Sequence, residues 1–146
     1  MRVAILAVVL VAALPALADD ENKKALKVLE GKWSVLALTT EGDPIHKKYL
    51  KKASLTIKGD RYILDRADGE KPREWIITLD PDRTTKRFHL TRPGEKAPAK
   101  VGLYELKGDT LKVAVAGVKR KAGPPKSLKP DLSVNTATFK RMKAKK

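Results

Sequence analysis

Short runs of alternating apolar and polar residues follow one another through most of the chain, and residues that favour turns separate them. Apolar side chains at every second position indicate a strand with one buried face. Gly59-Asp60 and Lys107-Gly108-Asp109 are tight connections of the kind that join hairpins. The pattern predicts eight strands, over residues 33–40, 53–58, 61–66, 74–79, 87–92, 100–106, 110–116 and 134–140.

Helical spacing is limited to two short segments. Leu26 and Leu29 follow Asp20-Glu21-Asn22, which suits the capped start of a helix, and Gly31 suits its end. Residues 45–52 have apolar side chains at helical spacing with lysines between them, which predicts a short amphipathic helix or a turn.

Eight short strands without a long central helix predict an all-β domain. An antiparallel barrel is the first interpretation and a sandwich is the alternative. Eight strands enclose a space that is either filled by side chains or holds one small ligand. Because the apolar residues of 33–40 fall on both faces, we expect the barrel interior on one side of that strand and the N-terminal helix on the other.

The first residues have the pattern of a secretory signal peptide. Met1-Arg2 is basic, an apolar run of 16 residues covers 3–18, and small residues precede a cleavage point after Ala18. The run is shorter than the ~20 residues that span a membrane, so we expect export to the periplasm or the exterior without a transmembrane anchor. A retained signal anchor is the alternative. The expected divisions are a signal peptide (1–18), a lead-in helix (19–28), a barrel domain (29–141) and a basic tail (142–146).

The sequence contains no cysteine, which excludes disulfides, thiolate metal sites and a lipid on an N-terminal cysteine. The net charge of +15 is concentrated late in the chain, where residues 107–146 hold twelve Lys and Arg against two Asp. Such a field attracts an acidic envelope polymer or a headgroup surface, or it serves solubility alone. Nucleic acid is not expected, because no aromatic residues suited to base stacking accompany the basic residues. We call the cluster that could attract such an acidic partner the basic patch; it consists of Lys119, Arg120, Lys121, Lys126 and Lys129.

Residue combinations typical of enzymes are scarce. His46 and His89 are the two histidines, and neither has an evident catalytic partner. We expect no catalytic residues, no bound metal and no cofactor, and therefore a protein that is not an enzyme. Turn formation explains the aspartates beside Gly or Pro better than acid–base chemistry does; these are Asp60, Asp68, Asp80, Asp82 and Asp109.

Six aromatic residues fall on predicted strands. They either line a cavity for a small apolar ligand or fill the core, and the sequence leaves both alternatives open. These ligand-cavity candidates are Trp33, Tyr62, Trp75, Phe88, Tyr104 and Phe139.

Several motifs in order carry a family resemblance. They are Leu29-x-Gly31-x-Trp33, Lys58-Gly59-Asp60-x-Tyr62, Leu79-Asp80-Pro81 and the run from Gly102 to Lys112 that contains Gly-x-Tyr-x-Leu-x-Gly-Asp-x-Leu. Over about residues 29–141 the chain resembles a bacterial, mostly exported family of lipocalin-like β-barrel domains of unknown function. The resemblance implies an antiparallel eight-stranded lipocalin-like barrel and export, but no activity. The chain departs from the family pattern at Ala114, Val115 and residues 123–128.

The first motif is also similar to the start of true lipocalins, in which the tryptophan closes one barrel end under a basic side chain near the last strand. This similarity implies a closing group of Gly31, Trp33 and Arg141, with a cation–π contact from Arg141 or Lys140 to Trp33.

The sequence therefore leads to two functional hypotheses. The first is an exported, non-enzymatic barrel that binds a small apolar ligand in its interior. The alternative is an envelope interaction protein that binds an acidic polymer or headgroup surface through its basic C-terminal face. The oligomeric state stays open.

Overall fold

The computed structural model describes residues 15–80, 86–119, 121 and 123–144. It contains two helices, α1 (Pro15–Leu29) and α2 (Lys47–Leu50), within these ranges. The strands are β1 (Gly31–Thr40), β2 (Asp43–Pro44), β3 (Ser54–Lys58), β4 (Arg61–Asp65), β5 (Arg73–Asp80), β6 (Arg87–Thr91), β7 (Lys100–Lys107), β8 (Thr110–Gly117) and β9 (Asn135–Arg141).

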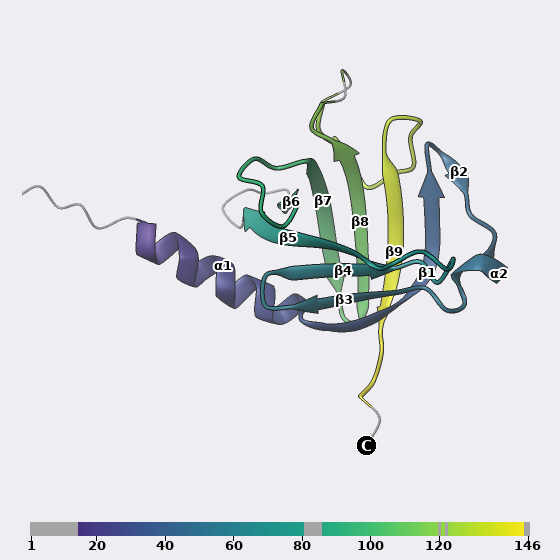
Figure 1. The fold of residues 1–146 in the computed structure, drawn as a ribbon, viewed down its shortest axis with the longest axis horizontal. Helices are drawn as coiled ribbons and strands as arrows, with labels where there is room; N and C mark the ends of the chain where they lie inside the picture. Colours follow the sequence, from purple (N-terminus) through teal and green to yellow (C-terminus); the bar gives the residue numbers. More distant parts are fainter. Residues whose placement is uncertain (1–14, 81–85, 120, 122, 145–146) are drawn as a thin grey trace, which may run out of the picture.

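The strands form one closed antiparallel sheet (Figure 1). From β3 to β9 each strand pairs with the next along the chain, and β1 pairs with both β3 and β9. This last pairing runs from Trp33↔Arg141 to Thr39↔Thr136 and leaves the barrel without an open edge. The fold is therefore an antiparallel eight-stranded lipocalin-like barrel with a short N-terminal helix, as predicted, and the sandwich alternative is wrong.

Each predicted strand is present within two residues of its expected bounds, but β2 was missed. Two residues are too few to show an alternating pattern, and Pro44 argued for a break. In the structure β2 pairs with Thr39 and Thr40 of β1 as a small extension. The helix α1 begins at Pro15, earlier than the expected lead-in helix, and so includes four residues of the expected signal peptide.

A β-bulge in β1 corrects the expectation that α1 lies against the outer face of this strand. Val35 pairs with Phe139 but Ala37 pairs with Thr138, so Leu36 is the extra residue. The bulge shifts the alternation by one position, and the apolar positions before and after it both face the interior. Leu36 itself is 45% exposed.

The C-terminal part of helix α1 instead closes one end of the barrel, at the lower left in Figure 1, and the rest of the helix extends away from the strands. Its Leu26 and Leu29 are buried in the same cluster as the interior side chains of the strands. The side chain of Asn22 ties the helix to β5, because its Oδ1 accepts a hydrogen bond of 2.8 Å from the Leu79 amide. We call this end of the barrel the closed end.

The antiparallel order places alternate connections at opposite ends of the barrel. The turns at Gly59-Asp60 and Gly108-Asp109 lie at the closed end with α1. The connections over residues 41–53, 66–72, 92–99 and 118–134 therefore gather at the other end, which we call the open end. The open end brings together residues that are far apart in the sequence. Examples are Arg66, which follows β4, and Lys100, which begins β7.

Candidate ligand-binding site

The half of the interior nearest the closed end is filled. Tyr62 and Phe88 stack with ring centroids 6.5 Å apart, and Tyr104 packs against Phe88 at 6.2 Å. The void among these rings and their aliphatic neighbours measures about 10 Å³. A water molecule needs roughly 10 to 15 Å³, so this region has no room for a ligand.

Trp33 and Arg141 seal the closed end. The guanidinium carbon of Arg141 lies 4.2 Å from the centroid of the Trp33 ring, which is fully buried. The same guanidinium donates hydrogen bonds of 2.6 and 2.7 Å to the carbonyl oxygens of Glu30 and Val28 at the end of α1. These carbonyls have no partner inside the helix, so Arg141 caps α1 and covers Trp33 at once.

The chain passes beneath this arginine at Gly31. Its φ of 133° lies in a region that side chains rarely adopt, and a Cβ atom there would lie 3.2 Å from Nη1 of Arg141. Trp33 completes the junction, because its indole nitrogen donates a 3.0 Å hydrogen bond to the carbonyl oxygen of Leu29. The structure thus brings together the three residues proposed for barrel closure.

The half of the interior nearest the open end is hollow. A cavity of about 300 Å³ lies there, and we call it the mouth cavity. Tyr62 and Val113 form its floor, since both also line the small void below it. Further apolar walls come from several strands, with Leu64, Trp75, Leu90 and Phe139 among them.

Cations surround the indole of Trp75 at the rim of the mouth cavity. The ammonium nitrogen of Lys100 lies 4.7 Å from its ring centroid, and the guanidinium carbon of Arg92 lies 5.8 Å from it. Arg66 and Arg73 line the same cavity. This positive rim was not foreseen from the sequence.

The environment shifts two ionisation equilibria in the cavity. Burial raises the pKa of the Tyr62 hydroxyl far above its usual range, so the phenol stays neutral. Burial lowers the pKa of the Lys100 ammonium group, and the neighbouring guanidinium groups of three arginines lower this pKa further; they belong to Arg73, Arg92 and Arg66.

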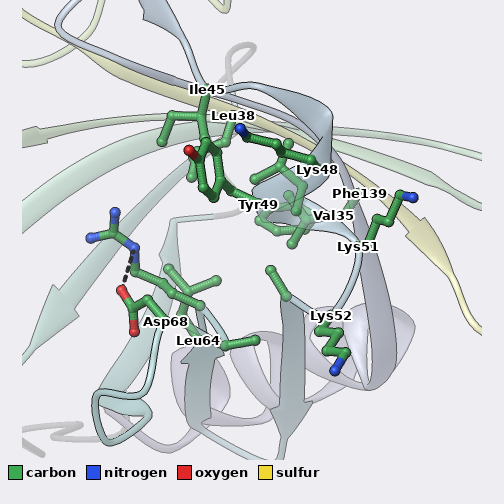
Figure 2. A pocket seen from close by; sticks show the side chains of 14 residues that line it. Val35, Leu38, Ile45, Lys48, Tyr49, Lys51, Lys52, Leu64, Asp68 and Phe139 are labelled. Atoms are coloured by element: carbon green, nitrogen blue, oxygen red, sulfur yellow. Dashed lines mark ion pairs between the residues drawn. The ribbon is translucent and has the colours of Figure 1, made fainter.

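A second hollow of about 440 Å³ lies beside the first, between α2, β1 and the end of β4. We call it the side hollow. Figure 2 shows Tyr49 and Lys48 of α2 on one side of it and Leu64 and Asp68 across from them. The dashed ion pair joins Asp68 to Arg66, with 3.7 Å between Oδ2 and Nε.

Only a thin wall separates the side hollow from the mouth cavity. Four side chains line both spaces, those of Leu38, Leu64, Arg66 and Phe139. The helix α2 is a single turn, and the ring of His46 caps it by accepting a hydrogen bond of 3.2 Å from the Lys48 amide. The side hollow, with α2 along it, and the mouth cavity therefore lie on opposite sides of this wall.

The six aromatic candidates divide between the two halves of the barrel. Phe88 and Tyr104 fill the lower half, and Trp33 lies beneath Arg141 at the closed end. Tyr62, Trp75 and Phe139 line the mouth cavity. The sequence left open whether these side chains fill the core or line a cavity. They fill the core in the half nearest the closed end and line a cavity in the half nearest the open end.

The basic patch lies in the 118–134 connection at the open end. Lys119, Lys121, Lys126 and Lys129 are exposed there, and Arg120 lies outside the described residues. Residues 142–144 of the basic tail leave β9 at the other end of the barrel, at the bottom of Figure 1. The described residues of the patch and of the tail therefore lie at opposite ends of the barrel.

The part of the chain that the structure describes has no group of three or more His, Asp or Glu placed to hold a metal ion. His89 lies on β6 between the inward Phe88 and Leu90, so its ring points to the outer face. No helix among the described residues is long and apolar enough to cross a membrane.

Comparison with protein-family models, with curated proteins and with solved structures finds no match to this chain. The resemblance to exported lipocalin-like domains therefore stays a prediction from the sequence motifs.

Sequence reasoning missed the cations of the mouth cavity because each looks like an ordinary charge beside a turn. Arg66 directly follows β4, Arg73 is the first residue of β5, and Lys100 is the first residue of β7. The signal that could have found them is topological. Once an up-and-down barrel is assumed, the end of β4 and the starts of β5 and β7 must share one rim.

Proposed function

We propose that this protein is an exported, non-enzymatic β-barrel module that binds a small apolar ligand in the mouth cavity. The observation that carries the proposal is the division of the interior into a filled lower half and a hollow upper half. A barrel of this strand number is either filled by side chains or holds one small ligand, and a cavity of about 300 Å³ at the open end favours the second.

The size and lining of the mouth cavity support this function. Ligand pockets commonly measure about 300 to 1,000 Å³ and have apolar and aromatic walls with a few polar groups. The mouth cavity lies at the lower limit of that range, with Tyr62, Trp75 and Phe139 in its walls. A small ligand suits it better than a large one.

Tryptophan fluorescence can test the binding. In the Trp33→Phe variant Trp75 is the single tryptophan, and it lies in the cavity wall. We expect a saturable change in its emission on titration with an uncharged apolar probe such as N-phenyl-1-naphthylamine. In the Trp75→Phe variant, Trp33 beneath Arg141 should respond little, because it is sealed at the closed end.

A matched pair of variants separates cavity binding from surface binding. Ala137→Leu adds a side chain inside the mouth cavity, whereas Ala37→Leu adds the same group on the exposed outer face of β1. We expect probe affinity to fall at least tenfold for Ala137→Leu and to stay unchanged for Ala37→Leu. Binding that is absent in the wild type, or equal in the two variants, would refute the proposal.

A second candidate is an envelope interaction protein that binds an acidic polymer through the basic patch. The exposure of Lys119, Lys121, Lys126 and Lys129 on one connection favours it. Retention on an acidic wall polymer should then weaken steeply with salt. Retention should also weaken when Lys119, Arg120 and Lys121 are changed to Ser. Retention that is the same at high salt and in this variant would reject this candidate.

A further inference from the structure

The charged residues of the mouth cavity are all of one sign. Among the described residues, Arg66, Arg73 and Lys100 line it, and no Asp or Glu does. The remaining polar lining comes from uncharged side chains such as Asn135 and Thr136. A space that is apolar below and cationic at its rim matches a ligand with an apolar part and a negative group.

The three cations and Arg92 lie beside two connections of the barrel and converge at the open end. They flank the β4–β5 turn and the loop between β6 and β7. The sheet pairs these elements in sequence, with β4 beside β5 and β6 beside β7. The barrel framework therefore fixes the spacing of the cations.

The acidic partners of the arginines lie outside the cavity. Arg66 pairs with Asp68 at 3.7 Å, and Arg73 pairs with Glu70 at 3.4 Å; both acids are in the exposed turn between β4 and β5. These exposed pairs are long and each contributes little. The arginines can therefore turn to an anion in the cavity at small cost.

Lys100 differs from the arginines because it forms no ion pair within the described part of the chain. Its ammonium group is half-buried against the Trp75 indole. Burial lowers the pKa of Lys100, and the guanidinium groups of Arg73, Arg92 and Arg66 act in the same direction. An anion placed beside Lys100 would offset this repulsion, because an opposite charge favours the charged form of the lysine.

We propose that the ligand of the mouth cavity is an anionic amphiphile, whose carboxylate binds Lys100 with Arg66 and Arg73 at the rim and whose apolar tail lies between Trp75 and Phe139. This inference rests on the proposed function, that the cavity binds a ligand, and adds the chemical class of that ligand. Arginine and lysine at the rim make charge-assisted hydrogen bonds to a carboxylate, and the arginines can do so with two donors each.

The cavity volume sets the length of the tail. A cavity of about 300 Å³ holds on the order of ten water molecules at the ~30 Å³ that each occupies in the liquid. A methylene group is of similar size, so a medium-chain carboxylate of about ten carbons fills the space. Decanoate is the probe, and decanol is its uncharged counterpart of equal chain length.

Isothermal titration calorimetry of the full protein at low salt, below the concentrations at which decanoate forms micelles, tests the inference. We expect decanoate to bind at least tenfold more tightly than decanol. Lys100→Gln and Arg73→Gln should each weaken decanoate binding about tenfold and leave decanol binding unchanged. Lys100→Arg, which keeps the positive charge, should retain most of the affinity for decanoate.

The matched control is Lys96→Gln, which removes a lysine from the loop that precedes Lys100 but not from the cavity. It should leave decanoate affinity within about twofold of the wild type. A thermal melt of each variant establishes that it is folded before its affinity is compared.

The possible outcomes separate this inference from the proposed function. Equal affinities for decanol and decanoate would overturn the anionic ligand and leave an apolar one standing. Equal losses for Lys96→Gln and Lys100→Gln would also overturn it, because the effect would then come from the general positive field. If neither decanoate nor decanol binds, and the emission of Trp75 does not respond to N-phenyl-1-naphthylamine, the proposed function is overturned as well.

Discussion

The contacts of Arg141 allow the strength of the closed end to be estimated. Changing Arg141 to Met keeps a long apolar stem but removes the hydrogen bonds to the carbonyl oxygens of Glu30 and Val28, which measure 2.6 and 2.7 Å. It also removes the cation–π contact with Trp33. The 3.6 Å ion pair of Arg141 with Asp109 adds little, since the Asp109 side chain is 65% exposed.

The expected magnitude follows from these losses. Hydrogen bonds to a charged group contribute about 1.5 to 3 kcal/mol each, and a cation–π contact contributes about 0.5 to 2 kcal/mol. The Arg141 side chain is 29% exposed, so water can replace part of each interaction. We therefore expect Arg141→Met to lower the free energy of unfolding by about 3 kcal/mol, less than the simple sum. For a domain of this size that corresponds to a fall of roughly 12 °C in Tm.

Urea unfolding followed by tryptophan fluorescence measures this change. Arg141→Lys keeps the charge but lacks the forked donors, so it should lose about 2 kcal/mol. The neighbouring Lys140 is exposed on the other face of β9, and Lys140→Met should stay within about 0.5 kcal/mol of the wild type. If Arg141→Met also stays within that limit, Arg141 does not fasten α1 to the barrel and the reasoning is refuted.

Three further predictions concern the core and the rim, and urea unfolding measures all of them. Trp33→Ala should lower the free energy of unfolding by about 3 to 5 kcal/mol, and a change below about 0.5 kcal/mol would show that Trp33 is not in the core. Gly102→Ala should cost about 1 to 3 kcal/mol, because the added Cβ would overlap the Phe88 ring and lie 2.8 Å from the Ala114 carbonyl oxygen; no change would contradict this packing. Lys100→Met should stabilise the protein at neutral pH. The pKa of Lys100 is lowered in the folded state, so its positive charge lowers the free energy of unfolding. This loss is fully present below the folded-state pKa and disappears as pH rises toward the ordinary pKa of about 10.4. A stabilisation by Lys100→Met that is the same at pH 10 as at neutral pH would refute this.

The barrel could be predicted from the sequence because its local signals agree. Alternation marked the inward residues, as with Leu55 and Ile57 of β3, and the Gly59-Asp60 turn fixed the register of the hairpin to β4. The bulge at Leu36 was missed because one inserted residue in an apolar strand leaves the strand apolar on both faces. The position of α1 was missed for the same reason.

The candidate site was predictable only in part. The aromatic residues on strands were identified, but the depth of each along the barrel axis depends on strand stagger, which alternation does not encode. Phe88 and Trp75 therefore looked equivalent in the sequence, although Phe88 fills the lower half and Trp75 lines the cavity. The cations of the rim could be identified only from the topology, because Arg66 and Lys100 come close together only when the strands are arranged in a barrel.

The pairing of the first strand with the last has a consequence for how the chain reaches this structure. Trp33 and Arg141 are partners across β1 and β9, so the barrel cannot close before nearly the whole chain has been synthesised. Contacts so distant in sequence slow folding. A chain that ends before β9 would leave β1 and β8 with unpaired edges at the same time, and such edges recruit other chains. Deletion of the last strand should therefore produce aggregates rather than a smaller barrel, because the last strand of the fold keeps the edges of β1 and β8 paired.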